Sequence, residues 1–163
     1  AGARARDGDG NLPIAGAISC GAPAAVVKLL LDAYPDGARS VDGKKHTLLH
    51  QAACSGQSAE TVRLLLAAWP EAAAMRDDKG NAPLHFAAGC KAAPGVVKEL
   101  LAACPEAASW RGQLDRYPLS LCLLCEAPPD SVAMIRDAYP DAQRVPELVA
   151  DYTNHGQGVG TAD

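Results

Sequence analysis

Apolar residues recur along the chain with the spacing of helices that are buried on one face. Between residues 59 and 68, Val62, Leu65 and Leu66 are three and four positions apart, so they share one side of a helix. A shorter apolar stretch lies near residues 48–55, and Gly56 and Gln57 separate the two stretches. The pattern therefore predicts a unit made of a turn, a short helix, a loop, a longer helix and a second turn.

This unit recurs with a period of 35 residues. A Pro-Leu pair or a similar pair marks the short helix at positions 13–14, 48–49, 83–84 and 118–119. An aromatic residue or Cys before Pro marks the end of the longer helix, at Tyr34-Pro35, Trp69-Pro70, Cys104-Pro105 and Tyr139-Pro140. A single apolar position keeps the same phase, at Leu30, Leu65, Leu100 and Ile135. Three markers in one phase predict a repeat array.

Start and stop signals support these helix boundaries. Ser58 is predicted to cap the longer helix of the second unit, and Glu60 is placed well for the helix dipole. Pro70 ends that helix, because it has no N–H and restricts the residue before it. In the other units, proline opens the longer helix, where a missing N–H costs little, at Pro23, Pro94 and Pro128-Pro129.

Residues 77–88, with the sequence DDKGNAPLHFAA, resemble the ankyrin repeat, whose pattern is D-x-x-G-x-T-P-L-H-x-A-A. This unit departs from the pattern only at Ala82, where Thr is usual. The second unit keeps Thr47 and His50 but lacks the proline, and Ala15 and Ser120 stand at the His position in the first and fourth units. The resemblance implies an all-α fold: an ankyrin-type helical solenoid of four helix-turn-helix repeats with little or no β structure.

The repeats set the expected domain organisation. An ankyrin-repeat domain is predicted over residues 7–145, with units 7–41, 42–76, 77–111 and 112–145, between an N-terminal extension (1–6) and a C-terminal tail (146–163). The pattern fails in the tail, because Thr153 stands where a fifth Pro-Leu pair would begin. The period is two residues longer than the usual ankyrin period of about 33. Both added residues are placed in connections, where insertion costs little free energy.

The terminal units lack the polar surface that an end repeat needs in water. The short helices of the first and fourth units, near residues 13–18 and 118–125, contain no charged residue. One hypothesis follows: tails, further repeats or a partner subunit cover one or both ends.

Composition and charge narrow the function. The net charge of −4 disfavours a dedicated nucleic-acid binder, and no apolar run approaches the roughly 20 residues that span a bilayer. The start of the chain, with Arg4 and Arg6 and no acidic residue before Asp7, is compatible with the end of an organelle transit peptide or with a trimmed start. The compartment therefore stays open between the cytoplasm and an organelle interior such as a plastid or mitochondrion.

The six cysteines are predicted to be reduced packing residues. Cys20, Cys90 and Cys125 occupy one repeat position, Cys122 takes an alanine position and Cys104 an aromatic one. Cys122 and Cys125 match C-x-x-C, but a zinc site needs about four ligands and no second pair is suitably spaced. Disulfides are disfavoured, because cysteines at one position of neighbouring repeats are expected about 8–10 Å apart. Reduced thiols fit a reducing compartment.

The histidines offer no catalytic arrangement. The resemblance to the ankyrin family implies that His50 and His85 order their turns by hydrogen bonds. Thr47 is a candidate partner of His50. His46 is predicted to lie at a turn tip as a contact residue. No catalytic or metal-binding residue and no cofactor is assigned.

The remaining candidate site is a surface. The resemblance implies a concave face formed by turn tips and short helices. Phe86, the only Phe in the chain, either binds a partner there or packs against Leu121. The longer helices place Lys28, Arg63 and Lys98 on the opposite, outer face. The predicted partner-binding residues are Lys44, Lys45, His46, Gln51, Asp78, Lys79, Asn81, Phe86, Trp110, Leu114, Arg116 and Leu121.

The favoured function is non-enzymatic protein binding through this face, as an adaptor or as a small subunit of a larger assembly that covers the end repeats. No nucleic acid is expected as a partner, nor direct insertion into a membrane. Two alternatives stay open: an enzyme or regulatory fragment with an unrecognised Cys–His site, and a fragment of a longer ankyrin protein.

Overall fold

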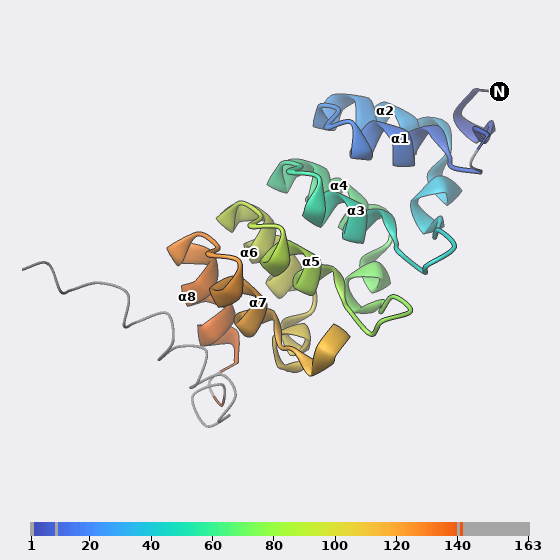
Figure 1. Ribbon diagram of the computed structural model, residues 1–163. Coiled ribbons are helices and arrows are strands. Elements are labelled where there is room, and N and C mark those ends of the chain that lie inside the picture. The colour runs from blue at the N-terminus through green and yellow to red at the C-terminus, as the bar shows by residue number, and fades with distance from the viewer. Residues whose placement is uncertain (1, 9, 140, 142–163) are drawn as a thin grey trace, which may run out of the picture.

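The computed structural model describes residues 2–8, 10–139 and 141 (Figure 1). Within these residues, eight α-helices form four helix-turn-helix pairs: α1 (Pro13–Ser19) with α2 (Ala24–Ala33), α3 (Leu48–Cys54) with α4 (Ala59–Ala68), α5 (Pro83–Gly89) with α6 (Pro94–Ala103), and α7 (Pro118–Leu124) with α8 (Pro129–Ala138). The predicted all-α fold is confirmed. The predicted tail (146–163) lies outside the described residues.

The helices form two layers. The short helices α1, α3, α5 and α7 pack side by side, and α2, α4, α6 and α8 form a second row behind them (Figure 1). Hairpin loops project between consecutive repeats beyond the row of short helices (Figure 1). In the described chain the one β contact is an antiparallel bridge between Val41 and Thr47 at the base of the second hairpin, which agrees with the expectation of little or no β structure.

The Pro-Glu-Ala-Ala connection is a packed element as well as a turn. The segments Pro35–Arg39, Pro70–Ala74 and Pro105–Ser109 are each a 3₁₀ helix that begins with proline. Each contacts the long helix before it and the one after it. Ala72 and Ala73 are buried there, as are Ala107 and Ala108. One added residue of the 35-residue period therefore lies in an element that helps to pack neighbouring repeats together.

The predicted helix boundaries agree with the structure. The Ser58 hydroxyl accepts a hydrogen bond from the Thr61 N–H at 3.2 Å and so caps α4. At the other end, Trp69 is extended (φ −150°, ψ 84°), because proline follows it. Tyr34 and Cys104 have almost the same backbone angles.

The core lies between the two layers and continues through all four repeats. Leu49, Leu84 and Leu119 are fully buried in the short helices, and Leu65, Leu100 and Ile135 are buried in the long ones. Leu30 is only partly buried, since α2 has a long helix beside it, α4, on one side only within the described residues. The exposed faces of α2 also carry apolar side chains: Leu29 is 68% exposed and Val26 40%.

Two buried histidines join consecutive repeats. His50 Nδ1 accepts from the Thr47 N–H at 3.1 Å and lies 2.9 Å from the Thr47 hydroxyl, while Nε2 donates to the Asn81 carbonyl at 3.1 Å. His85 repeats the arrangement one unit later, with Nδ1 accepting from the Ala82 N–H and Nε2 donating to the Trp110 carbonyl. The ordering role expected for both histidines, with Thr47 as the partner of His50, is confirmed.

Burial lowers the pKa of both imidazoles, and that of His85 falls to about 4. No helix in the described residues combines the length and the apolar character that a bilayer crossing needs.

Acidification is expected to destabilise the fold through these histidines. Between pH 6.5 and 4 the unfolded chain binds a proton at His85 that the folded chain excludes, so the free energy of unfolding falls as the pH drops. With a folded pKa of about 4, His85 alone costs on the order of 2 kcal/mol at pH 5 relative to pH 7. Urea denaturation at pH 7, 6 and 5 measures the loss. His85→Gln is less stable at pH 7 but loses less on acidification; equal slopes for the two proteins would exclude this origin.

Candidate functional site

Aspartates hold the hairpin tips of the second and third repeats in the same way. Asp42 Oδ1 accepts from the backbone N–H groups of Lys44 and His46, each at 2.8 Å. Asp77 Oδ1 accepts from the N–H groups of Lys79 and Asn81 at 2.9 and 2.7 Å. Burial by itself raises the pKa of both carboxyls, but these hydrogen bonds outweigh it and hold both pKa values below the usual one. Each tip is therefore organised around an ionised carboxylate.

His46 joins these two hairpins. Its Nδ1 lies 2.8 Å from Asp42 Oδ2, and its Nε2 lies 3.5 Å from Asp77 Oδ2 in the next repeat. The side chain is 21% exposed, so only one edge is open to a partner. His46 thus orders the tips, which the sequence did not predict, and stays at their surface.

The fourth hairpin is built differently. Gly112 stands where Asp42 and Asp77 stand in the preceding repeats. Asn81 of the third repeat contacts this hairpin instead, at a different N–H group: its Oδ1 accepts from the Gln113 N–H at 2.8 Å, and its Nδ2 donates to Asp77 at 3.0 Å. A Cβ on Gly112 would lie 2.3 Å from Asn81 Oδ1 and 2.7 Å from His85 Cδ2. The site therefore has no room for a side chain at residue 112.

This fourth hairpin presents a leucine to solvent. Leu114 is 80% exposed and has left-handed backbone angles (φ 58°, ψ 28°). Asp115 follows with φ 59°, at the repeat position where Gly10 and Gly80 take φ near 80°. A left-handed conformation costs roughly 1–2 kcal/mol for a residue with a Cβ. No burial of the Leu114 side chain offsets that cost.

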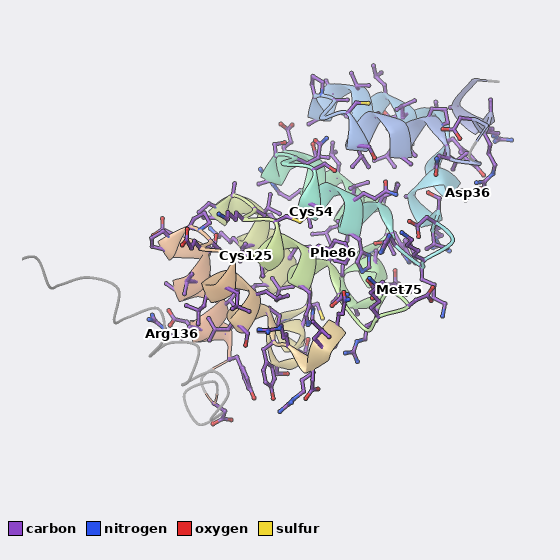
Figure 2. All side chains as sticks on the ribbon, viewed as in Figure 1. Asp36, Cys54, Met75, Phe86, Cys125 and Arg136 are labelled. Carbon is purple, nitrogen blue, oxygen red and sulfur yellow. A yellow bond between two sulfur atoms is a disulfide. The ribbon has the colours of Figure 1, made fainter. Side chains whose placement is uncertain are left out.

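Two grooves meet at Phe86, which lies near the middle of the solenoid in Figure 2. The apolar groove, about 410 Å³, lies between the third and fourth repeats and is lined by Asn81, His85, Phe86, Gly89, Cys90, Gln113, Leu114, Arg116 and Leu121. The charged groove, about 430 Å³, lies between the second and third hairpins and is lined by Lys44, His46, Asp77, Asp78, Lys79, Asn81, Phe86 and Gln113. Phe86, Asn81 and Gln113 form the wall that the grooves share.

Phe86 is held against the second repeat by edge-to-face ring contacts. Its ring centroid lies 5.2 Å from that of His46 and 5.1 Å from that of His50. The ring is only partly buried, and it also lines the apolar groove together with Leu121. Packing against repeat two and exposure toward the groove are therefore compatible.

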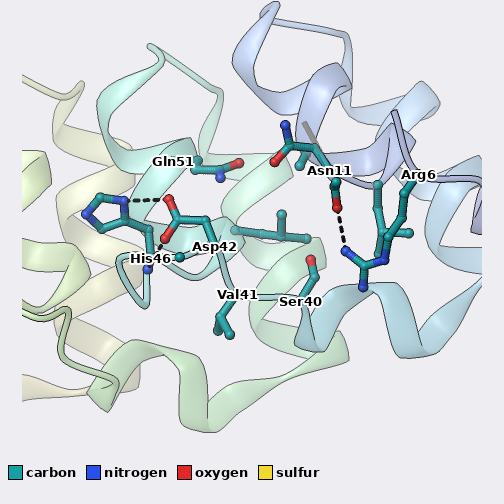
Figure 3. Close-up of a pocket in the computed structure, with 12 residues that line it drawn as sticks. Arg6, Asn11, Ser40, Val41, Asp42, His46 and Gln51 are labelled. Carbon is teal, nitrogen blue, oxygen red and sulfur yellow. Dashed lines mark hydrogen bonds and ion pairs between the residues drawn. The ribbon is translucent and has the colours of Figure 1, made fainter. Parts of the chain in front are cut away.

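A third cavity, the polar pocket, lies between the first and second hairpins and measures about 200 Å³. The side chains of Asp42, Gln51 and Asn11 gather around it (Figure 3). Arg6 borders it and donates to the Gly10 carbonyl at 2.5 Å (Figure 3). Gln51 Oε1 is buried and has no hydrogen-bond partner among the described residues, so a donor from a bound molecule would satisfy it.

The predicted site residues fall into three groups. Those that line one or both of the grooves that meet at Phe86 are Lys44, His46, Asp78, Lys79, Asn81, Phe86, Leu114, Arg116 and Leu121. Gln51 lies in the polar pocket, and Lys45 forms an ion pair with Asp78 at 3.1 Å. Trp110 lines none of these three cavities; it packs against the core, and the Arg76 guanidinium lies 5.5 Å from its ring centroid.

Sequence reasoning missed several lining residues. Asp77 was detectable, because aspartate recurs with the 35-residue period at Asp7, Asp42 and Asp77. The sequence did not indicate that Gln113, in the fourth hairpin, or Gly89 and Cys90, at the end of α5, would line a groove, because contacts between repeats bring them there.

The expectation about cysteines is wrong in part. Cys54, the last residue of α3, forms a disulfide with Cys90, which follows α5; Figure 2 labels Cys54 at the end of its helix. The expected separation applied to residues 35 apart at equivalent positions, but this pair is 36 apart and its Cα atoms are 5.1 Å from each other. This is within bridging range. The argument for a reducing compartment, which required reduced thiols, loses its basis.

The other four thiols differ in burial. Cys104 and Cys122 are buried as expected, whereas Cys20 is exposed and Cys125 is partly exposed. Burial raises the pKa of Cys104, and it raises that of Cys122 to about 12. Protonated thiols are poor nucleophiles, and the imidazoles of His50 and His85 are both hydrogen-bonded. No group of three or more potential metal ligands occurs among the described residues.

Restoring the repeat consensus at residue 112 is expected to be harmful. Gly112→Asp introduces the residue found at the equivalent position of the other repeats, but its Cβ overlaps Asn81 and His85. We expect a loss of about 2–3 kcal/mol in the free energy of unfolding, measured by urea denaturation. Gly16→Ala is the control, because nothing lies within 4 Å of its Cβ and the substitution favours a helix. An unchanged or raised midpoint for Gly112→Asp would contradict this packing.

Loss of the disulfide is expected to destabilise the fold. In a chain-entropy estimate, a loop closed across a separation of 36 residues contributes about 3–4 kcal/mol. The double variant Cys54→Ser/Cys90→Ser should lower the urea midpoint, and a thiol reductant should bring the wild type to the same value. Cys20→Ser, at an exposed free thiol, should leave the midpoint unchanged. If reductant leaves the wild-type midpoint unchanged, the bridge contributes nothing.

Comparison with known proteins agrees with this architecture. The family profile described as "Ankyrin repeats (3 copies)" matches residues 8–109, which is more than half of the chain. A search of curated proteins gives no significant match. The matched residues include the Asp-centred hairpins and both bridging histidines of the second and third repeats. The chain therefore belongs to the ankyrin-repeat family.

Proposed function

We propose that this chain binds other proteins through its concave face, as an adaptor or as a small subunit of a larger assembly. The concave face is defined as the hairpin tips together with the open sides of α1, α3, α5 and α7. Ankyrin repeats generally serve as protein–protein interaction modules, and the family is generally non-enzymatic. The specific proposal is that the two grooves that meet at Phe86 form the centre of the binding surface.

The observation that carries the proposal is the exposed, left-handed Leu114 beside the apolar groove. The fold gains no burial from this leucine, and glycine at the same place would remove the backbone cost. A strained residue with an exposed apolar side chain is a candidate contact residue. Phe86 and Leu121 line the same groove, so one bound side chain can touch all three apolar residues.

A role in a larger assembly is supported by apolar surface elsewhere. Leu29 and Val26 on α2 are exposed, and so is Leu124 at the end of α7, which is 40% exposed. These residues lie on elements of the first and fourth repeats and line neither of the grooves at Phe86. Contact with another subunit would remove this apolar area from water.

A non-enzymatic role is proposed from the state of the reactive side chains. The buried thiols of Cys104 and Cys122 have raised pKa values, and both ring nitrogens of His50 and His85 are occupied. These groups are arranged to stabilise the fold. Loss of an enzymatic activity on alkylation of the thiols, without unfolding of the protein, would contradict this assignment.

Leu114→Gly is expected to separate binding from stability. Glycine relieves the left-handed backbone, so thermal stability should rise slightly, by roughly 0.5–1 kcal/mol. Binding to the native partner should weaken by about tenfold or more, because the apolar contact is lost. Thermal unfolding and affinity measurement test the two effects, and Lys98→Ala, at an exposed position of α6 on the outer face, is the control.

Crosslinking mass spectrometry on the protein from its native source locates the surface independently. Lys44, Lys45 and Lys79 lie at the hairpin tips, whereas Lys28 and Lys98 lie on α2 and α6. Crosslinks to other proteins should concentrate at the tips. Crosslinks mainly from Lys28 and Lys98 would place binding on the outer face and refute the proposed site.

A further inference from the structure

Building on the proposed function, we propose that the concave face recognises an acidic, apolar segment of a partner protein: a large apolar side chain in the apolar groove with carboxylates beside it. The argument rests on which charges at the two grooves are already paired.

The carboxylates at the grooves are engaged within the chain. Asp77 accepts hydrogen bonds from Asn81 and Lys79 and lies beside His46. Asp78 is paired with Lys45, and Asp115, at the neighbouring tip, is paired with Arg111. A basic partner would have to compete with each of these interactions.

The cations at the grooves are not engaged. Among the described residues, the side chains of Lys44, Lys79 and Arg116 make no hydrogen bond or ion pair. Lys44 and Lys79 line the charged groove and are exposed, and Arg116 lines the apolar groove and is partly exposed. The available charge on this face is therefore positive, although the whole chain carries a net charge of −4. Opposite charge on a partner steers association and selects among partners.

The apolar groove supplies the second element of recognition. Phe86, Leu114 and Leu121 line it together with Gly89 and Cys90, and its volume of about 410 Å³ accommodates a large aliphatic or aromatic side chain. Its wall at Phe86, Asn81 and Gln113 is shared with the charged groove. An extended segment that crosses Phe86 therefore meets the apolar groove and the free lysines in succession. Three cations are too few for a nucleic-acid surface, which needs many phosphate contacts.

A displayed library of random 12-residue peptides, selected on the immobilised full chain, provides the probe. The expected peptides combine a large apolar residue with an excess of Asp and Glu. Binding of a selected peptide, followed by fluorescence anisotropy, should weaken about tenfold or more in Lys44→Glu/Lys79→Glu, because two attractive charges become repulsive. The matched control, Lys28→Glu/Lys98→Glu, makes the same change of net charge on the outer face and should alter affinity less than about twofold. Thermal unfolding confirms that both double variants are folded.

Salt dependence gives a second readout. Raising NaCl from 50 to 300 mM should weaken binding to the wild type and have a smaller effect on Lys44→Glu/Lys79→Glu, because exposed charges are screened. Selection of basic or uncharged peptides, selection of none, or equal effects of the two double variants would overturn the acidic-segment proposal. Failure of the proposed function is distinguishable: binding of the native partner would then be insensitive to Leu114→Gly. Sensitivity to Leu114→Gly without sensitivity to the lysines refutes the acidic segment alone.

Discussion

The neutral imidazole of a buried histidine is the interaction on which this solenoid depends. In the second and third repeats it accepts a hydrogen bond at the start of its own helix and donates one to a carbonyl group of the hairpin that follows. One side chain thus fixes a helix start and the position of the neighbouring hairpin. Because the histidines are buried, their pKa values are lowered and the required neutral form persists at neutral pH. These contacts hold the second repeat to the third and the third to the fourth, and the two grooves that meet at Phe86 lie between those repeats.

The hairpin tips are ordered by a second set of contacts, made by aspartate side chains and by His46. Ionised Asp42 and Asp77 organise two hairpins, and His46 connects them. In the fourth hairpin no aspartate stands at the equivalent position; the Asn81 side chain of the third hairpin bonds the Gln113 N–H, and the close approach of Asn81 requires glycine at residue 112. Gln113 and Leu114 of this hairpin line the apolar groove together with Phe86. The apolar groove therefore lies where the fourth repeat departs from the common pattern.

Buried and exposed positions of α5 differ in how closely they follow the repeat pattern. Leu84, His85 and Ala88 of α5 are buried and fit the repeat, whereas Phe86 on the same helix is partly exposed and differs from its counterparts Gln51 and Leu121. The Cys54–Cys90 disulfide links the ends of α3 and α5, and Cys90 also lines the apolar groove. The side of the apolar groove that contains Cys90 is thus covalently attached to the second repeat. Such support keeps a binding surface in place without enlarging it.

The sequence by itself determined the repeat architecture. Helix periodicity, proline positions and the 35-residue phase depend on local chemistry that recurs in every unit, so the helix starts at residues 48, 83 and 118 and the Ser58 cap could be predicted. The resemblance to the ankyrin repeat also placed Phe86 on the concave face, as a candidate contact residue. Tertiary structure alone decided the Cys54–Cys90 bridge, the contact of Asn81 with the fourth hairpin beside Gly112, and which charges at the grooves remain available. The bridge and the Asn81 contact join residues of different repeats, and so does the Lys45–Asp78 ion pair at the charged groove. Offsets of one residue and distances of a few ångströms decide these contacts, and a repeat period read along the sequence contains neither.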